Sequence, residues 1–242
     1  EEVGSEVQKV TKGDFVISPF AWADNTCPIC RDGFQTACPH GGFFSAAQAE
    51  YVRVPQADGT LVVTEATDDE ATLKSLLTLS DVYLTGYHAA FMAKVQPGQT
   101  VTVVGDGAVG LSAVLAAKTM GAERIILMGR HTDRTDLGRR FGATDVVAER
   151  GKTGIAQVRE LTGGEGSHVV LEAVGHRPAY DQSVAVVRAG GVISRVGVPQ
   201  YDEAPVGFAS LFGRNITLTG GPAPVRAYLE QAIPQVLDGT IN

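Results

Sequence analysis

The chain is poor in several features that would point to particular classes of protein. Its 242 residues contain only three cysteines, one tryptophan and five histidines, and the formal net charge is −7 at pH 7. No apolar run approaches the roughly 18 residues of a membrane-spanning helix, and no secretory signal pattern opens the chain. The negative charge argues against nucleic acid or an anionic membrane as the main partner. We therefore expect a globular, cytoplasmic protein that acts on small molecules.

The three cysteines lie close together in one short stretch. They form Cys27-x2-Cys30-x7-Cys38, an odd number at close spacing, which suits a metal or reduced thiols better than a disulfide framework. A structural zinc takes four ligands, and Asp24 continues the same spacing on the N-terminal side. His40 is the other candidate for the fourth ligand, and a loop that has lost its metal is the alternative. We predict Zn²⁺ at Asp24, Cys27, Cys30 and Cys38.

A glycine motif lies between a β-branched run and a helical stretch. Residues 102–104 favour a strand, and residues 111–120 have helix-forming composition with one apolar face. Between them stands Gly105-Asp106-Gly107-Ala108-Val109-Gly110, so the order of strand, tight turn and helix matches a dinucleotide-binding fingerprint. The helix N-terminus would offer free N–H groups to the phosphates. A glycine turn in another kind of α/β unit is the alternative.

The next predicted strand, 124–128, ends without the acidic residue of an NAD site. That residue would bond the adenosine ribose about 20 residues beyond the glycines. Gly129 stands there instead, followed by Arg130, His131 and Arg134. Because a glycine leaves room for a ribose 2′-phosphate and a guanidinium can bind it, we predict NADP(H) in preference to NAD(H). The alternative is that both arginines are solvated residues at the start of a helix.

Strands and helices are expected to alternate regularly after residue 98. The predicted strands are 100–105, 124–128, 145–147, 168–172, 191–197 and 215–219, and the helices between them are 108–119, 133–141, 154–161 and 178–187. This alternation predicts an α/β fold with a doubly wound parallel sheet.

The flanking parts of the chain have different patterns. Short alternating runs such as 14–18 and 49–54 predict small antiparallel strands in the first 70 residues. Helical spacing follows over residues 68–93, and a last helical stretch covers 225–237.

Several segments together resemble the zinc-dependent medium-chain dehydrogenases of the alcohol dehydrogenase type. These segments are Glu2 to Ser5, Lys12 to Val16, the cysteine stretch, Ser80 to His88, Val103 to Gly110, Leu171 to Gly175, Gly190-Gly191 and Val196-Gly197. The resemblance implies a partial GroES-like catalytic domain over 1–82 and a Rossmann domain over 83–219. Residues 220–242 would start a return segment, so we expect a fragment that lacks both ends.

The resemblance also implies a catalytic zinc whose third ligand precedes a Thr-Gly pair. Asp81 stands at that place, where many members have cysteine, and Thr85 is expected to position the nicotinamide ring. Alternatively, Asp81 caps the helix that follows it. The Gly-His-Glu segment with the other catalytic ligands is absent from this sequence. We therefore do not expect turnover by this stretch of chain alone.

Two further groups complete the predicted site. Val174-Gly175 and Val196-Gly197-Val198 lie at the carboxyl ends of two predicted strands and are expected to flank the nicotinamide, with tight packing at strand ends as the alternative. Phe20 and Trp22 are expected to line the substrate pocket, although an aromatic residue there can equally belong to the core.

The function that the resemblance implies is hydride transfer between NADP(H) and an alcohol, aldehyde or ketone. A polyol or amino-alcohol dehydrogenase is a second possibility. A nucleotide-binding or redox-sensing module without turnover is a third, from a different class. The resemblance further implies a homodimer or homotetramer for the complete protein.

Overall fold

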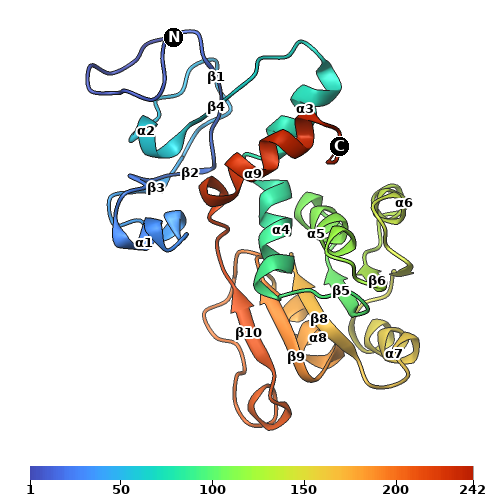
Figure 1. Cartoon of the computed structure of the whole chain (residues 1–242). Helices are drawn as coiled ribbons and strands as arrows, with labels where there is room; N and C mark the ends of the chain where they lie inside the picture. The colour runs from blue at the N-terminus through green and yellow to red at the C-terminus, as the bar shows by residue number, and fades with distance from the viewer. Residues whose placement is uncertain (242) are drawn as a thin grey trace. The chain divides into compact units, whose positions relative to one another are not determined.

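The computed structural model describes residues 1–241, which form two compact units (Figure 1). The first unit is discontinuous and comprises residues 1–84 together with the chain from Ala223 onward. The second unit comprises Thr85–Pro222. The sequence prediction placed the divisions after residues 82 and 219. Among the described residues, no helix combines the length and apolar character that crossing a bilayer requires.

The second unit contains a six-stranded parallel sheet. Its strands are β5 (Thr100–Val104), β6 (Arg124–Met128), β7 (Asp145–Val147), β8 (Ser167–Glu172), β9 (Val187–Arg195) and β10 (Thr217–Gly220), in the spatial order β10-β9-β8-β5-β6-β7. The chain leaves β5 toward β6 and β7 and then returns to β8 on the other side. This is the strand order of the Rossmann fold, so the predicted doubly wound sheet is confirmed.

Helices cover both faces of this sheet because its strands are apolar on both sides. The helices are α4 (Val82–Met92), which contains the unit boundary, α5 (Ala108–Thr119), α6 (Thr132–Arg140), α7 (Gly151–Leu161) and α8 (Arg177–Val186), with the short turn η2 (Phe212–Arg214). Ile125 and Leu127 pack with α4 and α5, whereas Ile126 and Met128 pack with α7 and α8. The alternation along one strand thus supplies both cores, as expected for a buried parallel sheet.

Strand β9 begins earlier than the sequence predicted. It starts at Val187, directly after α8, where the prediction placed the start at residue 191. Val187 pairs with Ser167, and the register shifts before Val192 pairs with Val169. The strand also ends at Arg195, so Val196 and Gly197 belong to the following loop.

The first unit is built from short elements. They are β1 (Phe15–Ile17), β2 (Ala21–Trp22), α1 (Pro28–Arg31), η1 (Gln35–Ala37), β3 (Gly42–Phe43), α2 (Ala57–Thr60), β4 (Val62–Thr64), α3 (Glu70–Thr78) and α9 (Val225–Leu237). Antiparallel pairs form between β1 and β4 and between β2 and β3. The strand predicted over 49–54 is wrong: that segment pairs with no strand, and Tyr51 within it is 74% exposed. Alternation without a surface to cover does not produce a strand.

Helix α9 joins the first unit through a buried arginine. Arg226 is only 8% exposed, and its Nε donates to the carbonyl oxygen of Gly59 at 3.1 Å. Its Nη2 donates to Glu230 one turn further along the same helix. The C-terminal helix is therefore tied to the α2 segment of the same unit.

Candidate functional site

Four loops meet at the carboxyl edge of the parallel sheet. They follow β5, β6, β8 and β9, and they begin at Gly105, Gly129, Ala173 and Val196. A Cβ added to Gly105 would lie 2.8 Å from Val174 Cγ2, and one added to Gly175 would overlap the carbonyl of Val198. The structure therefore brings together the predicted residues of the fingerprint and of both later strand ends. In such sheets, ligands bind at this edge, at the point where the strand order reverses, here between β5 and β8.

The three fingerprint glycines have different surroundings. Gly105 has a φ of +114°, which favours glycine, and a Cβ on Gly110 would overlap the carbonyl oxygen of Gly105. A Cβ on Gly107 would meet no protein atom within 4 Å. Gly107 is also the N-cap of α5, and as a glycine it has no side chain that could accept a hydrogen bond from the helix start. Open space beside uncapped N–H groups fits the diphosphate of a dinucleotide.

The turn after β6 is held by a carboxylate from the neighbouring strand end. Asp106 Oδ2 accepts from the backbone N–H groups of Arg130 and His131, each at 2.9 Å, and lies 2.9 Å from His131 Nδ1. Burial acts to raise the pKa of Asp106, but the hydrogen bonds from His131 and Arg130 outweigh it and leave that pKa below its ordinary value. The carboxylate is therefore ionised at neutral pH.

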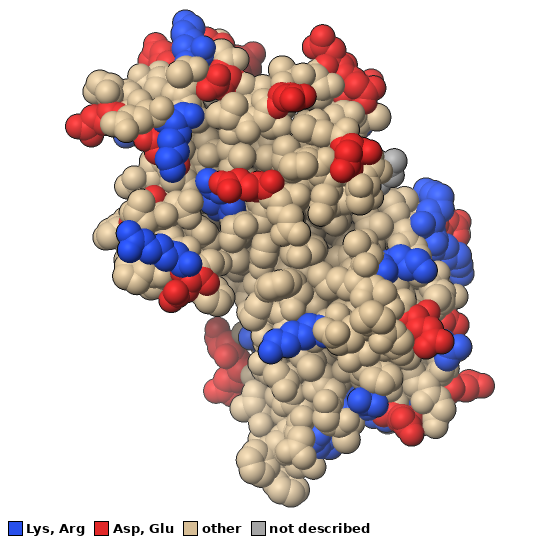
Figure 2. Space-filling view, viewed as in Figure 1, with Lys and Arg blue, Asp and Glu red and all other residues tan. Residues whose placement is uncertain are grey.

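Exposed cations lie just before α6 and along this helix. Figure 2 shows Lys and Arg side chains gathered in this region, where Arg130, Arg134, Arg139 and Arg140 are all exposed. Arg139 pairs with Asp136. Within the described chain, the guanidinium groups of Arg130 and Arg134 form no ion pair. Both can therefore bind an anion without first giving up another partner.

A second buried carboxylate, which the sequence prediction missed, lies at the end of β8. Glu172 is fully buried, and its Oε1 accepts from the backbone N–H groups of Val174 and Gly175 at 2.8 Å each. Burial raises the pKa of this carboxyl above its ordinary value. Its sequence signal is an acidic residue that ends an apolar strand just before Val174-Gly175. Glu172 shapes the loop that is expected to flank the nicotinamide.

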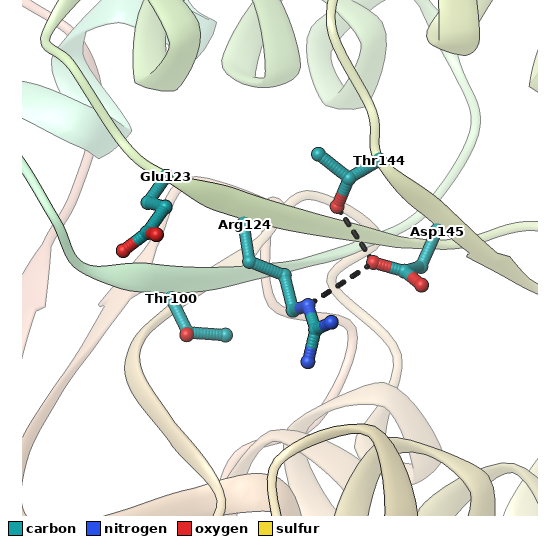
Figure 3. Close-up of a pocket in the computed structure, with 5 residues that line it drawn as sticks. All are labelled: Thr100, Glu123, Arg124, Thr144 and Asp145. Atoms are coloured by element: carbon teal, nitrogen blue, oxygen red, sulfur yellow. Dashed lines mark hydrogen bonds and ion pairs between the residues drawn. The ribbon is translucent and has the colours of Figure 1, made fainter.

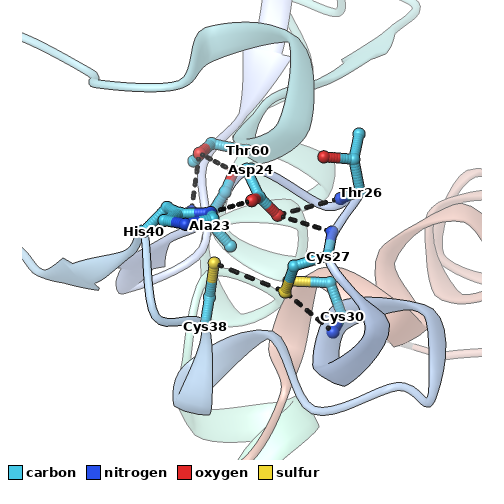
Figure 4. Close-up of polar contacts among 8 residues, drawn as sticks. All are labelled: Ala23, Asp24, Thr26, Cys27, Cys30, Cys38, His40 and Thr60. Carbon is cyan, nitrogen blue, oxygen red and sulfur yellow. Dashed lines mark hydrogen bonds and ion pairs between the residues drawn. The ribbon is translucent and has the colours of Figure 1, made fainter.

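The cysteine stretch forms a compact group in the first unit (Figure 4). One ligand atom each from Asp24, Cys27, Cys30 and Cys38 lies within 4.8 Å of the others, and the sulfurs of Cys27 and Cys38 are 4.0 Å apart. Sulfurs bound to a tetrahedral zinc stand about 3.8 Å apart, from a Zn–S bond of about 2.3 Å. The four residues thus fit a structural zinc. Burial raises the pKa of the Cys30 thiol, so this thiol is protonated unless a metal replaces its proton.

Asp24 is better placed as the fourth ligand than His40. His40 Nδ1 lies 2.6 Å from Asp24 Oδ2, while Asp24 Oδ1 accepts from the backbone of Thr26 and Cys27. The hydrogen bond with His40, together with these backbone bonds, holds the pKa of Asp24 well below its usual range. His40 therefore orients the carboxylate, as residues behind a metal ligand commonly do.

The residues predicted around a catalytic zinc do not form such a group. Asp81 is exposed and directly precedes α4, and Thr85 is buried within that helix. Among the described residues, the only group of three or more potential metal ligands is the one at Asp24, so Asp81 belongs to none. These residues do not fit a catalytic zinc by themselves, and the ligand role of Asp81 stays a prediction.

The two predicted pocket aromatics pack within the first unit. The ring of Phe20 stacks on that of Phe43, with centroids 5.9 Å apart. The indole of Trp22 lies over Gly42, where an added Cβ would come within 2.9 Å of the ring. Both aromatic side chains are half-buried. Their role toward a substrate stays a prediction.

A pocket at the opposite edge of the sheet is not part of this site. It has a volume of about 580 Å³ and is lined by Thr100, Glu123, Arg124, Thr144 and Asp145, at the amino ends of β5, β6 and β7 (Figure 3). Three of its polar side chains, those of Arg124, Thr144 and Asp145, engage one another or the backbone. Asp145 accepts from Thr144 and pairs with Arg124, which also donates to the carbonyl of Leu161.

Comparisons with known proteins agree with this architecture. Residues 108–238 match the family model of zinc-binding dehydrogenases, and residues 1–65 match the alcohol dehydrogenase GroES-like domain. The chain is 34% identical to zinc-type alcohol dehydrogenase B of Aspergillus flavus, over 96% of this chain and 56% of that protein. It is 33% identical to an NADP-dependent isopropanol dehydrogenase of Clostridium beijerinckii, over 81% of this chain and 57% of that protein.

Solved structures give the same result. The alcohol dehydrogenase TADH from Thermus sp. ATN1 superposes with a TM-score of 0.88 at 30% identity, over 100% of this chain and 71% of that chain. The chain spans less than two thirds of the length of the curated relatives just named. The matches cover both units and carry the expected fold, so the chain belongs to the zinc-dependent medium-chain dehydrogenase family of the alcohol dehydrogenase type.

Proposed function

We propose that the second unit binds NADP(H) in preference to NAD(H). The observation that carries this proposal is the turn after β6, where Gly129 replaces an acidic residue and exposed Arg130 and Arg134 form no ion pair within the described chain. A relative that is named as NADP-dependent supports the same choice. A charge-assisted bond to the 2′-phosphate would strengthen binding by about tenfold to a hundredfold.

We infer that the complete protein is an oxidoreductase that acts on an alcohol, an aldehyde or a ketone. The bound nicotinamide supplies the carbon that accepts or donates hydride. The N-terminus of α5 would bind the diphosphate, and Val174-Gly175 and Val196-Gly197-Val198 would flank the nicotinamide ribose and ring. Thr85 would orient the ring from α4. Three thiols in one metal site suit a reducing, cytoplasmic compartment, and a homodimer or homotetramer is the proposed assembly.

A fluorescence titration of the purified chain with NADPH and with NADH tests the cofactor proposal. We expect NADPH to bind at least about tenfold more tightly, and Arg130→Ala to remove most of that difference. Arg140→Ala is the matched control, because it removes an exposed cation from the last turn of α6, whereas Arg130 lies in the turn that precedes this helix. Equal binding of both nucleotides by the unmodified chain would place Arg130 and Arg134 in solvent.

We also propose that Asp24, Cys27, Cys30 and Cys38 hold a structural zinc. Metal analysis of the folded chain should find about one zinc ion per chain, and Asp24→Ala and Cys30→Ser should each lose it. His40→Ala should retain zinc with weaker affinity, by about tenfold or more, because His40 only orients the carboxylate. A folded chain without zinc would show that the loop has lost its metal.

A non-catalytic nucleotide-binding module remains the second candidate, and one observation favours it. Among the described residues, Asp81 belongs to no group of three or more potential metal ligands. The discriminating experiment uses the complete protein with NADP⁺ and a panel of secondary alcohols, polyols and amino alcohols. Turnover that Asp81→Ala abolishes would support the dehydrogenase, and the preferred alcohol would decide between its subclasses. Nucleotide binding without turnover would support the module.

A further inference from the structure

The carboxylate of Asp106 connects two strand ends that the fingerprint rule treats separately. Asp106 follows β5, yet Oδ2 of its side chain accepts from the backbone N–H groups of Arg130 and His131, which follow β6. The side chain is only 8% exposed. One buried atom therefore determines the path of the turn that leads into α6.

Gly129 and Asp106 are packed as a pair. A Cβ added to Gly129 would overlap the Cβ of Asp106, and it would lie 2.9 Å from Oδ2. Any larger residue at position 129 would therefore displace the carboxylate from the N–H groups it accepts. Glycine at position 129, in place of an acidic residue, is thus required by the packing of Asp106, and it also leaves room for a ligand.

The local charges suit a phosphate despite the buried carboxylate. Asp106 Oδ2 is surrounded by two backbone N–H groups and by Nδ1 of His131, and these offset its charge. The other ring nitrogen of His131, Nε2, is not used in the contact with Asp106, and the His131 side chain is 43% exposed. Arg130, within this turn, and Arg134, in the first turn of α6, add exposed guanidinium groups.

We propose that Asp106 is the positioning residue of the 2′-phosphate subsite: it holds the Gly129–His131 turn so that Arg130 and His131 face the phosphate. This inference rests on the proposed NADP(H) site and adds to it. Asp106 itself does not bind the nucleotide. Its carboxylate sets the backbone from which the phosphate-binding side chains project.

The test compares Asp106→Ala with Asp106→Asn in titrations of the full chain with NADPH and with NADH. We expect Asp106→Ala to weaken NADPH binding by about tenfold and NADH binding by less than about threefold. The amide oxygen of Asp106→Asn can accept the same N–H groups, so this variant should recover most of the NADPH affinity. Asp136→Asn is the control, because it removes an exposed carboxylate of α6 that does not contact the turn.

A second variant covers the case in which Asp106→Ala does not fold. His131→Ala leaves both backbone hydrogen bonds of Asp106 in place, and it should still lower NADPH affinity selectively, by about threefold or more.

Several outcomes would overturn the inference. Equal weakening of both nucleotides by Asp106→Ala would make Asp106 a general support of the fingerprint. A gain in NADPH affinity would mean that its carboxylate repels the phosphate and serves the ribose hydroxyls. If the unmodified chain binds neither nucleotide or binds both equally, the proposed NADP(H) preference fails too. A strong NADPH preference that Asp106→Ala leaves unchanged removes only the role of Asp106.

Discussion

Two glycines of the fingerprint are required for different reasons: Gly110 for the packing of the fold and Gly107 for nucleotide binding. A Cβ at Gly110 would overlap a backbone oxygen, so Gly110→Ala should destabilise the second unit by about 1–3 kcal/mol. Gly107 has an extended backbone and open space, so Gly107→Ala should change stability by less than about 0.5 kcal/mol.

Nucleotide binding should depend on Gly107, although stability does not. Gly107→Ala should still weaken NADPH binding by about tenfold, because its methyl group would stand where the diphosphate approaches. Urea unfolding and fluorescence titration of both variants measure the two effects. Unchanged binding by Gly107→Ala would mean that the phosphates lie elsewhere.

Glu172 should make stability depend on pH. Its folded-state pKa is raised by burial, so above the ordinary value of 4.5 the folded chain holds a proton that the unfolded chain has lost. The contribution of Glu172 to stability is therefore greatest at low pH and declines as pH rises through the folded-state pKa. Glu172→Gln cannot ionise, and its Oε1 can still accept from Val174 and Gly175.

The measurement is the melting temperature of both chains from about pH 4 to pH 8. We expect the difference, variant minus unmodified chain, to increase with pH over this interval. Taking the difference cancels the titration of other groups. Parallel curves would show that Glu172 is ionised in the folded chain with its ordinary pKa.

The sequence was sufficient to propose most residues of the candidate site, but not the side chains that hold its loops in place by hydrogen bonds. The fingerprint and the cysteine spacing are local patterns, so Gly105 and Cys27 could be assigned from their neighbours alone. Asp106 and Glu172 act across strands, on partners that only the fold brings near them. Gly129 was a signal for this, since its missing side chain makes room for Asp106.

At the scale of elements, the second unit was predictable and the first only in part. Strands 124–128 and 145–147 and helix 108–119 have the predicted bounds, because glycine turns and apolar periodicity mark their ends. In the first unit, 49–54 has a strand pattern, but the strand that pairs with β1 is β4. Propensity over three to six residues does not specify a partner.

Helix α9 should stabilise the first unit through Arg226. Arg226→Ala leaves the carbonyl of Gly59 without this buried donor and should destabilise that unit by about 1–3 kcal/mol. Glu230→Ala is the matched control: it removes a partner whose side chain is 71% exposed and should cost less than about 1 kcal/mol.

Hydrogen exchange resolves where this effect acts. Protection should fall in α2, α3 and α9 of Arg226→Ala and stay unchanged in β5 and β8. A uniform loss over both units would show that α9 does not stabilise the first unit specifically.

For the whole molecule, we expect two ligands to act on two units. Saturating NADPH at about 100 times its Kd should stabilise the second unit by about 2.7 kcal/mol. A chelator should lower the stability of the first unit by withdrawing zinc from the cysteine group. Differential scanning calorimetry with each addition should therefore move different parts of the unfolding profile. A chelator that shifts only the NADPH-sensitive transition would contradict this assignment.

The first unit is discontinuous in sequence, and this affects the order in which a growing chain can fold. Residues 1–84 leave the ribosome long before α9, which contributes the buried Arg226 to their unit. Every strand of the parallel sheet is synthesised in between. During translation, part of the apolar surface of residues 1–84 therefore stays uncovered until the second unit and α9 have been synthesised. This interval is when the nascent chain is most exposed to chaperones and proteases.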